Sequence, residues 1–138
     1  MKALISGGFG DLGMLEKLKI LIVEDDPANM IVSVKSMEKR GVKVMSAMSA
    51  SEALAVYENV PDLSAVLTDI QLPGTDGVEM MHKMRQKEET TGILIPIFAM
   101  TAYVFGEEKE YFKDLGFDDV FIKPVDYDEV LKTVQLYL

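Results

Sequence analysis

Cysteine is absent from the 138 residues of the sequence. Disulfide bonds, thiolate nucleophiles and cysteine-ligated zinc or iron–sulfur centres are therefore excluded. The absence fits a reducing cytoplasm, which is the location that we expect. No apolar run approaches the roughly 20 residues that a helix needs to span a bilayer, so we expect no membrane contact. The apolar residues 1–5 break at once into a glycine-rich stretch, which is not the pattern of a signal peptide.

Positive charge is scarce as well, because 14 Lys and Arg stand against 23 Asp and Glu, which gives a net charge of −9. Nucleic-acid binding needs a basic surface, so we expect no direct contact with DNA or RNA.

The only histidine, His82, falls within a helical pattern and is expected at the surface. Hydrophobic residues make up 49% of the chain, which excludes a disordered protein and suits one domain with a buried core.

Five short apolar segments alternate with five helical patterns along the chain. The segments are residues 20–23, 42–45, 65–68, 93–100 and 120–122. Helix-capping residues precede four of the helical patterns: Asp26, Ser49 with Glu52, Asp76, and Asp126 with Glu129. Leu138 is expected on the inward face of the last helix. This alternation predicts an α/β fold with a five-stranded parallel sheet covered by helices on both faces. We expect residues 1–18 to be a tail or linker and residues 19–138 to be the domain.

Charged and hydroxyl side chains follow four of the predicted strands. They are Glu24, Asp25 and Asp26 after the first strand, Asp69 after the third, Thr101 after the fourth and Lys123 after the fifth. Ligands of such sheets bind at the carboxyl ends of the strands, where these side chains would converge.

This set of side chains predicts phosphoryl transfer beside a metal ion. Crowded carboxylates repel one another unless a cation neutralises them, and oxygen ligands favour a hard ion such as Mg²⁺. Asp69 is the best candidate for the nucleophile because it stands alone after a central strand. Glu24 and Asp25 would hold the metal, Lys123 would pair with a phosphoryl oxygen, and Thr101 would donate a hydrogen bond to it.

Four segments also resemble the signature segments of a known family. They are ILIVEDDP, VLTDIQLPGTDG, PIFAMTA and FIKP, in this order. They resemble the receiver domains of two-component response regulators, and the resemblance covers about residues 19–138. It implies a flavodoxin-like, doubly wound sheet of strand order 2-1-3-4-5 with five helices. It also implies that Asp69 is the phosphorylated residue, that the backbone carbonyl of Gln71 is a further metal ligand, and that Lys123–Pro124 is a cis peptide.

The resemblance implies a role in a phosphorelay. Mg²⁺-dependent transfer from a phosphohistidine donor to Asp69 would switch the binding of a downstream protein. The donor would be a histidine kinase or a histidine phosphotransfer protein. The domain would be no enzyme beyond catalysing its own phosphorylation and dephosphorylation. A stand-alone protein, an excised receiver of a hybrid kinase and a homodimer all stay open.

One position departs from the family pattern. Receivers often carry an aromatic switch residue three positions before the lysine, where this chain has Val120. The aromatic residue here is Phe121, and strand alternation places it on the other face of the sheet. We therefore expect a smaller switch than a bulky ring would give.

Three alternative functions have specific observations against them. A phosphatase that uses an aspartyl phosphate would want a second acid where Gln71 stands. A flavin-binding module would want a phosphate-cradling loop where the chain has the acidic stretch EDDP. A degenerate receiver would have lost Asp69 or Lys123, and the sequence has both.

Overall fold

A single parallel sheet of five strands organises the computed structural model. The structure describes residues 15–70, 72, 76–102 and 108–138. The strands are β1 (Lys19–Val23), β2 (Lys43–Ala47), β3 (Ala65–Asp69), β4 (Ile97–Thr101) and β5 (Asp119–Ile122). The helices are α2 (Pro27–Glu38), α3 (Ala50–Asn59), α4 (Gly77–Thr91), α5 (Glu108–Leu115) and α6 (Tyr127–Gln135). The strand order β2-β1-β3-β4-β5 confirms the predicted fold class.

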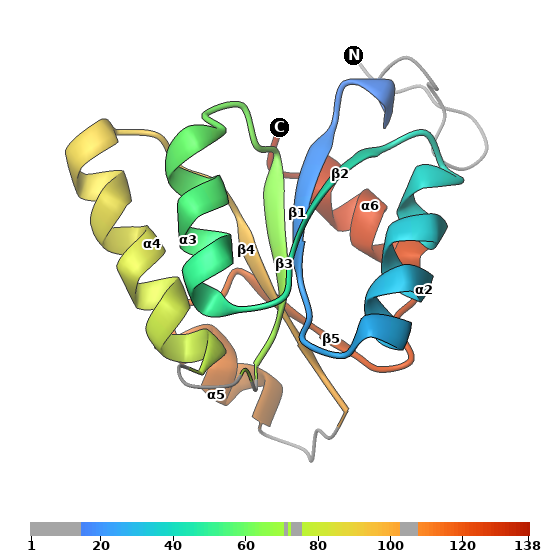
Figure 1. Ribbon diagram of the computed structural model, residues 1–138. Helices are drawn as coiled ribbons and strands as arrows, with labels where there is room; N and C mark the ends of the chain where they lie inside the picture. The colour runs from blue at the N-terminus through green and yellow to red at the C-terminus, as the bar shows by residue number, and fades with distance from the viewer. Residues whose placement is uncertain (1–14, 71, 73–75, 103–107) are drawn as a thin grey trace.

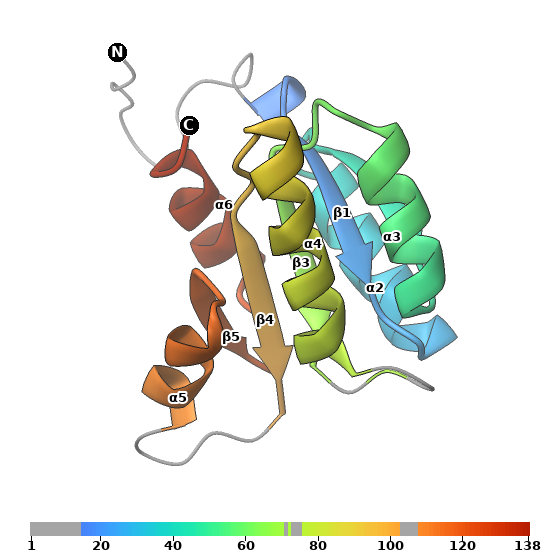
Figure 2. The ribbon, with the colours of Figure 1, turned by 90° about the vertical axis from the view of Figure 1, so that its left-hand side faces the viewer.

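Helices cover both faces of this sheet. In Figures 1 and 2, α3, α4 and α5 lie on one face, and α2 and α6 lie on the other. Two hydrophobic clusters fill the spaces between the three layers, one on each side of the sheet. None of the helices described here is both long and apolar enough to cross a membrane.

The central strands form because nearly all of their residues are apolar and buried on both faces. In β1, Leu21 and Val23 belong to the cluster under α3 and α4, whereas Ile20 and Ile22 belong to the cluster under α2 and α6. This alternation follows from the two-residue repeat of a strand. A continuous apolar run therefore identifies a strand that is covered on both sides, as β1 and β3 are.

The predicted helix caps are confirmed. Asp26, Ser49, Asp76 and Asp126 each accept a hydrogen bond from a backbone N–H in the first turn of their helix. The capping box at α3 differs in one detail, because the Glu52 carboxylate accepts from the N–H of Met48. His82 is exposed, as expected.

Four predicted boundaries or placements were wrong. β4 begins at Ile97 and not at residue 93, because Pro96 has no N–H for the ladder and Leu94 is exposed. The helical pattern after Asp26 was expected to run to Gly41, but α2 ends at Glu38. β2 runs two residues further than predicted, to Ala47. Leu138 is 63% exposed because α6 ends three residues before it.

The core extends closer to the amino terminus than the predicted domain boundary. Leu15 and Leu18 are each 2% exposed and pack in the cluster under α2 and α6. Residues 1–14 lie outside the described residues, so the assignment of a tail or linker stays a prediction.

Arg85 connects α4 to the entrances of β4 and β5. Its guanidinium donates to the carboxylates of Glu88 at 2.8 Å and Asp118 at 2.6 Å, and to the carbonyl of Gly116 at 2.9 Å. Asp118 also accepts the backbone N–H of Ile97 at 2.8 Å. This network fixes where β4 starts, because it supplies a partner to the first N–H of the strand.

Replacing Arg85 with methionine is expected to lower the free energy of unfolding by about 2–3 kcal/mol. The variant leaves the carboxylate of Glu88, which is 9% exposed, without its counter-charge. The loss stays below that of a fully buried pair because Arg85 itself is 26% exposed. Urea unfolding measures the change. The matched control is Lys83→Met, whose exposed pair with Glu79 spans 4.0 Å; equal losses in both variants would contradict the prediction.

Candidate metal and phosphoryl-transfer site

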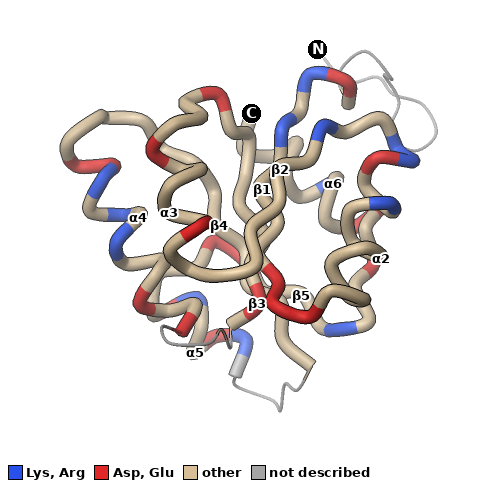
Figure 3. Tube along the Cα trace, in the orientation of Figure 1, with Lys and Arg blue, Asp and Glu red and all other residues tan. Residues whose placement is uncertain are grey.

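The acidic residues picked out by sequence converge at the carboxyl ends of the strands. Glu24 and Asp25 directly follow β1, Asp69 is the last residue of β3, and Lys123 directly follows β5. Figure 3 colours Asp and Glu red and shows acidic segments close together near the labels of β3 and β5. The parallel arrangement causes this, because every strand delivers its last residue to the same edge.

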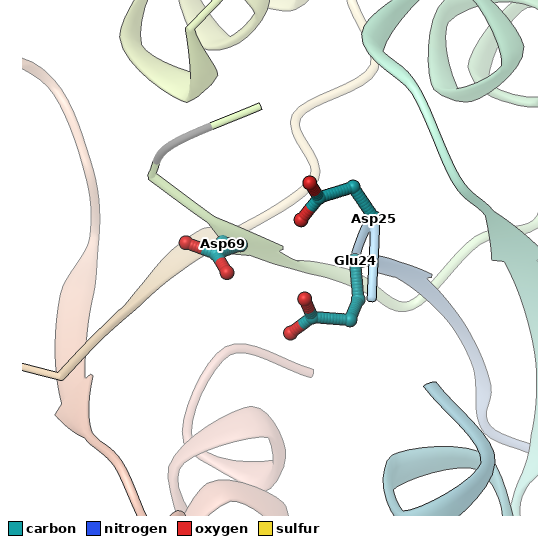
Figure 4. Close-up of side chains that lie close together, drawn as sticks. All are labelled: Glu24, Asp25 and Asp69. Atoms are coloured by element: carbon teal, nitrogen blue, oxygen red, sulfur yellow. The ribbon is translucent and has the colours of Figure 1, made fainter. Parts of the chain in front are cut away.

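Three carboxylates share one small region. Oxygen atoms of Glu24, Asp25 and Asp69 lie within 4.8 Å of one another. Figure 4 shows the three side chains converging from the ends of two neighbouring strands. This spacing allows the three residues to bind one cation together.

The Lys123 ammonium closes one side of the cluster. Its Nζ lies 2.7 Å from Oδ2 of Asp69 and 3.1 Å from Oε1 of Glu24. Burial alone would lower the pKa of Lys123, but these two hydrogen bonds outweigh burial and hold the pKa above its ordinary value. Lys123 therefore stays charged at neutral pH and offsets part of the negative charge.

Glu24 and Asp25 differ in their surroundings although they are neighbours in the sequence. Glu24 is 2% exposed, whereas Asp25 is exposed. Burial raises the pKa of Glu24; the Asp26 N–H, which donates at 3.2 Å, and Lys123 oppose this rise, and the charge of Asp69 adds to it. Glu24 thus links Lys123 to the cluster, and Asp25 faces solvent.

The cluster lines an open hollow of about 400 Å³. Its lining residues are Glu24, Asp25, Asp26, Asn29, Asp69, Leu72 and Lys123. Sequence reasoning missed Asn29 and Leu72. Asn29 lies in the first turn of α2, so its position one turn after the acidic run could have revealed it.

Two other predicted site residues have different outcomes. Thr101 is the half-buried last residue of β4, and its carbonyl accepts the N–H of Lys123 at 2.8 Å, so it stands at the same edge as the cluster. Gln71 lies outside the described residues, so its role as a metal ligand stays a prediction. The predicted cis peptide is present at Lys123–Pro124.

Val120 and Phe121 point to opposite faces of the sheet, as the strand alternation predicts. Val120 packs in the cluster under α3 and α4, and Phe121 packs in the cluster under α2 and α6. The Phe121 ring meets that of Phe98 edge to face, with the ring centres 5.6 Å apart. Phe121 is therefore a core residue on the face away from α5.

Gly77 holds the start of α4 against the backbone of the Asp69 loop. Its N–H donates to the carbonyl of Ile70 at 2.6 Å. A Cβ at this position would lie 2.6 Å from the carbonyl oxygen of Asp69 and 2.9 Å from Cα of Ile70. Sequence analysis did not single out this glycine, because the close approach joins two segments that are separated in the chain.

Replacing Gly77 with alanine is expected to displace Asp69 and to lower stability by about 1–3 kcal/mol, because backbone atoms must move to admit the methyl group. Phosphorylation of the variant by a small acyl phosphate should slow markedly at a temperature where it is still folded. The control is Gly92→Ala, where a positive φ of 74° costs about 1 kcal/mol but no atom lies within 4 Å. Equal phosphorylation rates in the two variants would contradict the prediction.

Comparison with known proteins agrees with this fold. A sequence model of the response regulator receiver domain matches residues 20–135, and the chain therefore belongs to the receiver domain family of two-component phosphorelays. Receiver domains are signalling domains.

Two curated relatives are 32% and 34% identical to this chain. Over 117 residues, the chain is 32% identical to the sensor histidine kinase GacS of Pseudomonas protegens, covering 84% of this chain and 13% of GacS. It is 34% identical over 124 residues to an uncharacterized 14.6 kDa protein of Leptolyngbya boryana, covering 89% of this chain and 92% of that protein. The chain thus spans only a small part of GacS.

A solved structure supports the fold directly. The receiver domain of Ssk1 from Saccharomyces cerevisiae, crystallised with the histidine phosphotransfer protein Ypd1, superimposes with a TM-score of 0.76. It is 25% identical, and the match covers 86% of this chain and 87% of that chain.

Proposed function

We propose that Asp69 accepts a phosphoryl group from a phosphohistidine donor. The observation that carries the proposal is the contact of the Lys123 ammonium, 2.7 Å from Asp69, beside two further carboxylates. A carboxylate at the end of a central strand, a fixed ammonium and a cation-binding cluster are the parts that phosphoryl transfer needs.

The transfer itself requires little covalent chemistry from the protein. One carboxylate oxygen of Asp69 attacks phosphorus, forming an O–P bond while the N–P bond of the phosphohistidine breaks. The electron pair of the broken bond stays on the imidazole nitrogen, which takes up a proton. No general base is needed, because a carboxylate is already ionised at neutral pH. Lys123 then pairs with a phosphoryl oxygen and stabilises the added charge.

The donor set of the cluster fits Mg²⁺. Its ligands are all oxygen atoms, and one ammonium offsets only part of the charge of three carboxylates. Glu24, Asp25 and Asp69 would hold the ion, with the backbone carbonyl of Gln71 as a further ligand. When bound, Mg²⁺ would offset the charge between Asp69 and the phosphoryl oxygens.

Thr101 would carry the signal away from Asp69. Its hydroxyl would donate to a phosphoryl oxygen, and the chain after β4 would follow. Val120 offers no ring to move with it, so the change at α5, β5 and α6 would be modest. A downstream protein would read this surface, and the domain would catalyse only its own phosphorylation and dephosphorylation.

The donor would be a histidine kinase or a histidine phosphotransfer protein. The likeness to the Ssk1 receiver, which was crystallised with Ypd1, supports the second of these. The relatives that are histidine kinases support the first. A cytoplasmic location and a homodimer stay predictions.

Intact-protein mass spectrometry tests the proposal. The protein is incubated with a small acyl-phosphate donor, with Mg²⁺ or with a chelator. We expect one phosphoryl group to be added only with Mg²⁺, and to be lost on brief alkaline treatment because an acyl phosphate hydrolyses readily.

Asp69→Asn is the decisive variant, because the amide keeps the shape of the side chain without its nucleophilic charge. Incorporation should disappear in this variant and persist in Asp76→Asn, whose carboxylate caps α4. Labelling of Asp69→Asn at the rate of the unmodified protein would refute the assignment.

A further inference from the structure

A second pocket lies at the opposite end of the molecule from Asp69. It has a volume of about 280 Å³ and lies between the carboxyl ends of α3 and α4 and the segment that leads into β4. Its lining residues are Tyr57, Glu58, Pro61, Lys87, Thr90, Thr91, Ile93 and Ile95. Figures 1 and 2 show α3 and α4 side by side, with their last turns at the end away from the acidic cluster. The phosphoryl-transfer chemistry uses none of these residues.

One polar group in the pocket has no hydrogen-bond partner among the described residues. The side chain of Tyr57 is 8% exposed, and among the described residues its hydroxyl makes no hydrogen bond. The oxygen is nevertheless not sealed from solvent, and Tyr57 lines the pocket. Burial raises the pKa of Tyr57 to about 12, with Glu88 adding to the rise. The hydroxyl therefore stays neutral and can both donate and accept a hydrogen bond.

The electrostatics of the pocket favour a cation. The carboxyl end of a helix carries partial negative charge, which a basic residue in the last turn usually offsets. Neither α3 nor α4 has a basic residue in its last turn. Glu58 stands in the last turn of α3, and Glu89 stands in that of α4 beside Glu88, whose charge Arg85 already offsets. Pro61 follows Tyr57 by four positions and has no N–H, so the Tyr57 carbonyl lacks its helical donor.

A single ion pair spans the pocket. Nζ of Lys87 lies 3.3 Å from Oε2 of Glu58, and both side chains are about half exposed. Such a pair contributes little and opens readily. A competing cation could therefore take over Glu58 without a large cost.

We propose that this pocket binds a small organic cation with a flat apolar body. The body would lie against Ile93, Ile95 and the Tyr57 ring, where a cation also gains from the face of the ring. Its N–H groups would donate to the Tyr57 hydroxyl and the Glu58 carboxylate. An anion would meet Glu58 and two negative helix ends, and only Lys87 could pair with it.

Three isosteric probes separate charge from shape: benzamidine, benzamide and benzoate. We expect benzamidine to bind about tenfold more tightly than benzamide and benzoate to bind most weakly, because Glu58 and the two helix ends together outweigh the single ammonium of Lys87. Backbone NMR shifts locate each probe, and the largest should fall at Glu58, Thr91 and Ile93. Equal affinities for the three probes would overturn the proposal. So would benzamidine shifts confined to Asp25 and Asp69, since they would place the cation in the acidic hollow.

Two variants test the residues. Tyr57→Phe should weaken benzamidine binding about fivefold through the lost hydrogen bond, whereas Tyr111→Phe, on the exposed face of α5, should have no effect. Lys87→Met keeps the aliphatic body but removes the competing charge, so benzamidine should bind about threefold more tightly while benzamide is unaffected. Weaker benzamidine binding by Lys87→Met would contradict the assigned role of Glu58. Because Asp69 is remote from every probe contact, these results do not depend on whether it is phosphorylated.

Discussion

Replacing Lys123 with methionine is expected to slow phosphorylation of Asp69 at least about 100-fold, with Mg²⁺ binding retained. The ammonium lies 2.7 Å from Asp69, where charge builds up during transfer, and loss of one such fixed donor costs about 100- to 1,000-fold in rate. Phosphorylation by a small acyl phosphate at saturating Mg²⁺, followed by intact mass, measures the change.

The affinity for Mg²⁺ should rise in Lys123→Met, whereas the rate of phosphorylation should fall. Lys123 offsets the charges of Glu24 and Asp69, so its removal leaves the carboxylates with more negative charge and should tighten Mg²⁺ binding. Lys132→Met changes the net charge by the same amount on the exposed side of α6 and should alter neither property. Parallel loss of metal binding and phosphorylation in Lys123→Met would show that the ammonium supports the metal site, contrary to the expectation.

Replacing Asp25 with alanine should weaken Mg²⁺ binding at least about tenfold and abolish most of the stabilisation by the metal. A ligand present at 100 times its dissociation constant stabilises the folded state by about 2.7 kcal/mol, so the effect on thermal unfolding is large. Without metal, the same variant should be slightly more stable, because one of three repelling carboxylates is gone. Calorimetric titration and thermal unfolding with and without Mg²⁺ measure both effects.

Asp26→Ala is the matched control for this prediction. It removes the same charge from the next residue, but Asp26 caps α2 and is not one of the three clustered carboxylates. We expect a loss of about 1 kcal/mol with or without Mg²⁺, from the missing cap, and unchanged metal affinity. Opposite signs of the metal-free stability change in the two variants distinguish a ligand from a cap. Equal losses of Mg²⁺ affinity would contradict the assignment of Asp25.

The site was largely predictable because parallel topology brings strand ends together. Once residues 20–23 and 65–68 are recognised as buried strands, the residues that follow them must share an edge of the sheet. The proximity of Glu24, Asp25 and Asp69 follows from this alone, and the caps at Asp26 and Asp76 follow from local hydrogen bonding.

Other features depended on contacts between distant segments. The sequence EDD does not reveal that Glu24 is buried and Asp25 exposed, because α2 and the loop after β5 decide which side chain they cover. The start of β4 was misplaced for a similar reason, since Asp118, the residue before β5, supplies the partner for the N–H of Ile97. The pocket at Tyr57 exists only because two helices end beside each other.

The sequence by itself determined the order of strands and helices along the chain, the starts of the four capped helices and the residues delivered to the functional edge. Each of these follows from local periodicity, capping and the rule that parallel strands end on one side. The tertiary structure alone decided which carboxylate is buried, how closely Gly77 approaches Asp69, and that Arg85 joins α4 to the segments that enter β4 and β5. These depend on distances between segments far apart in the chain, and side-chain packing fixes such distances only after the whole domain has folded.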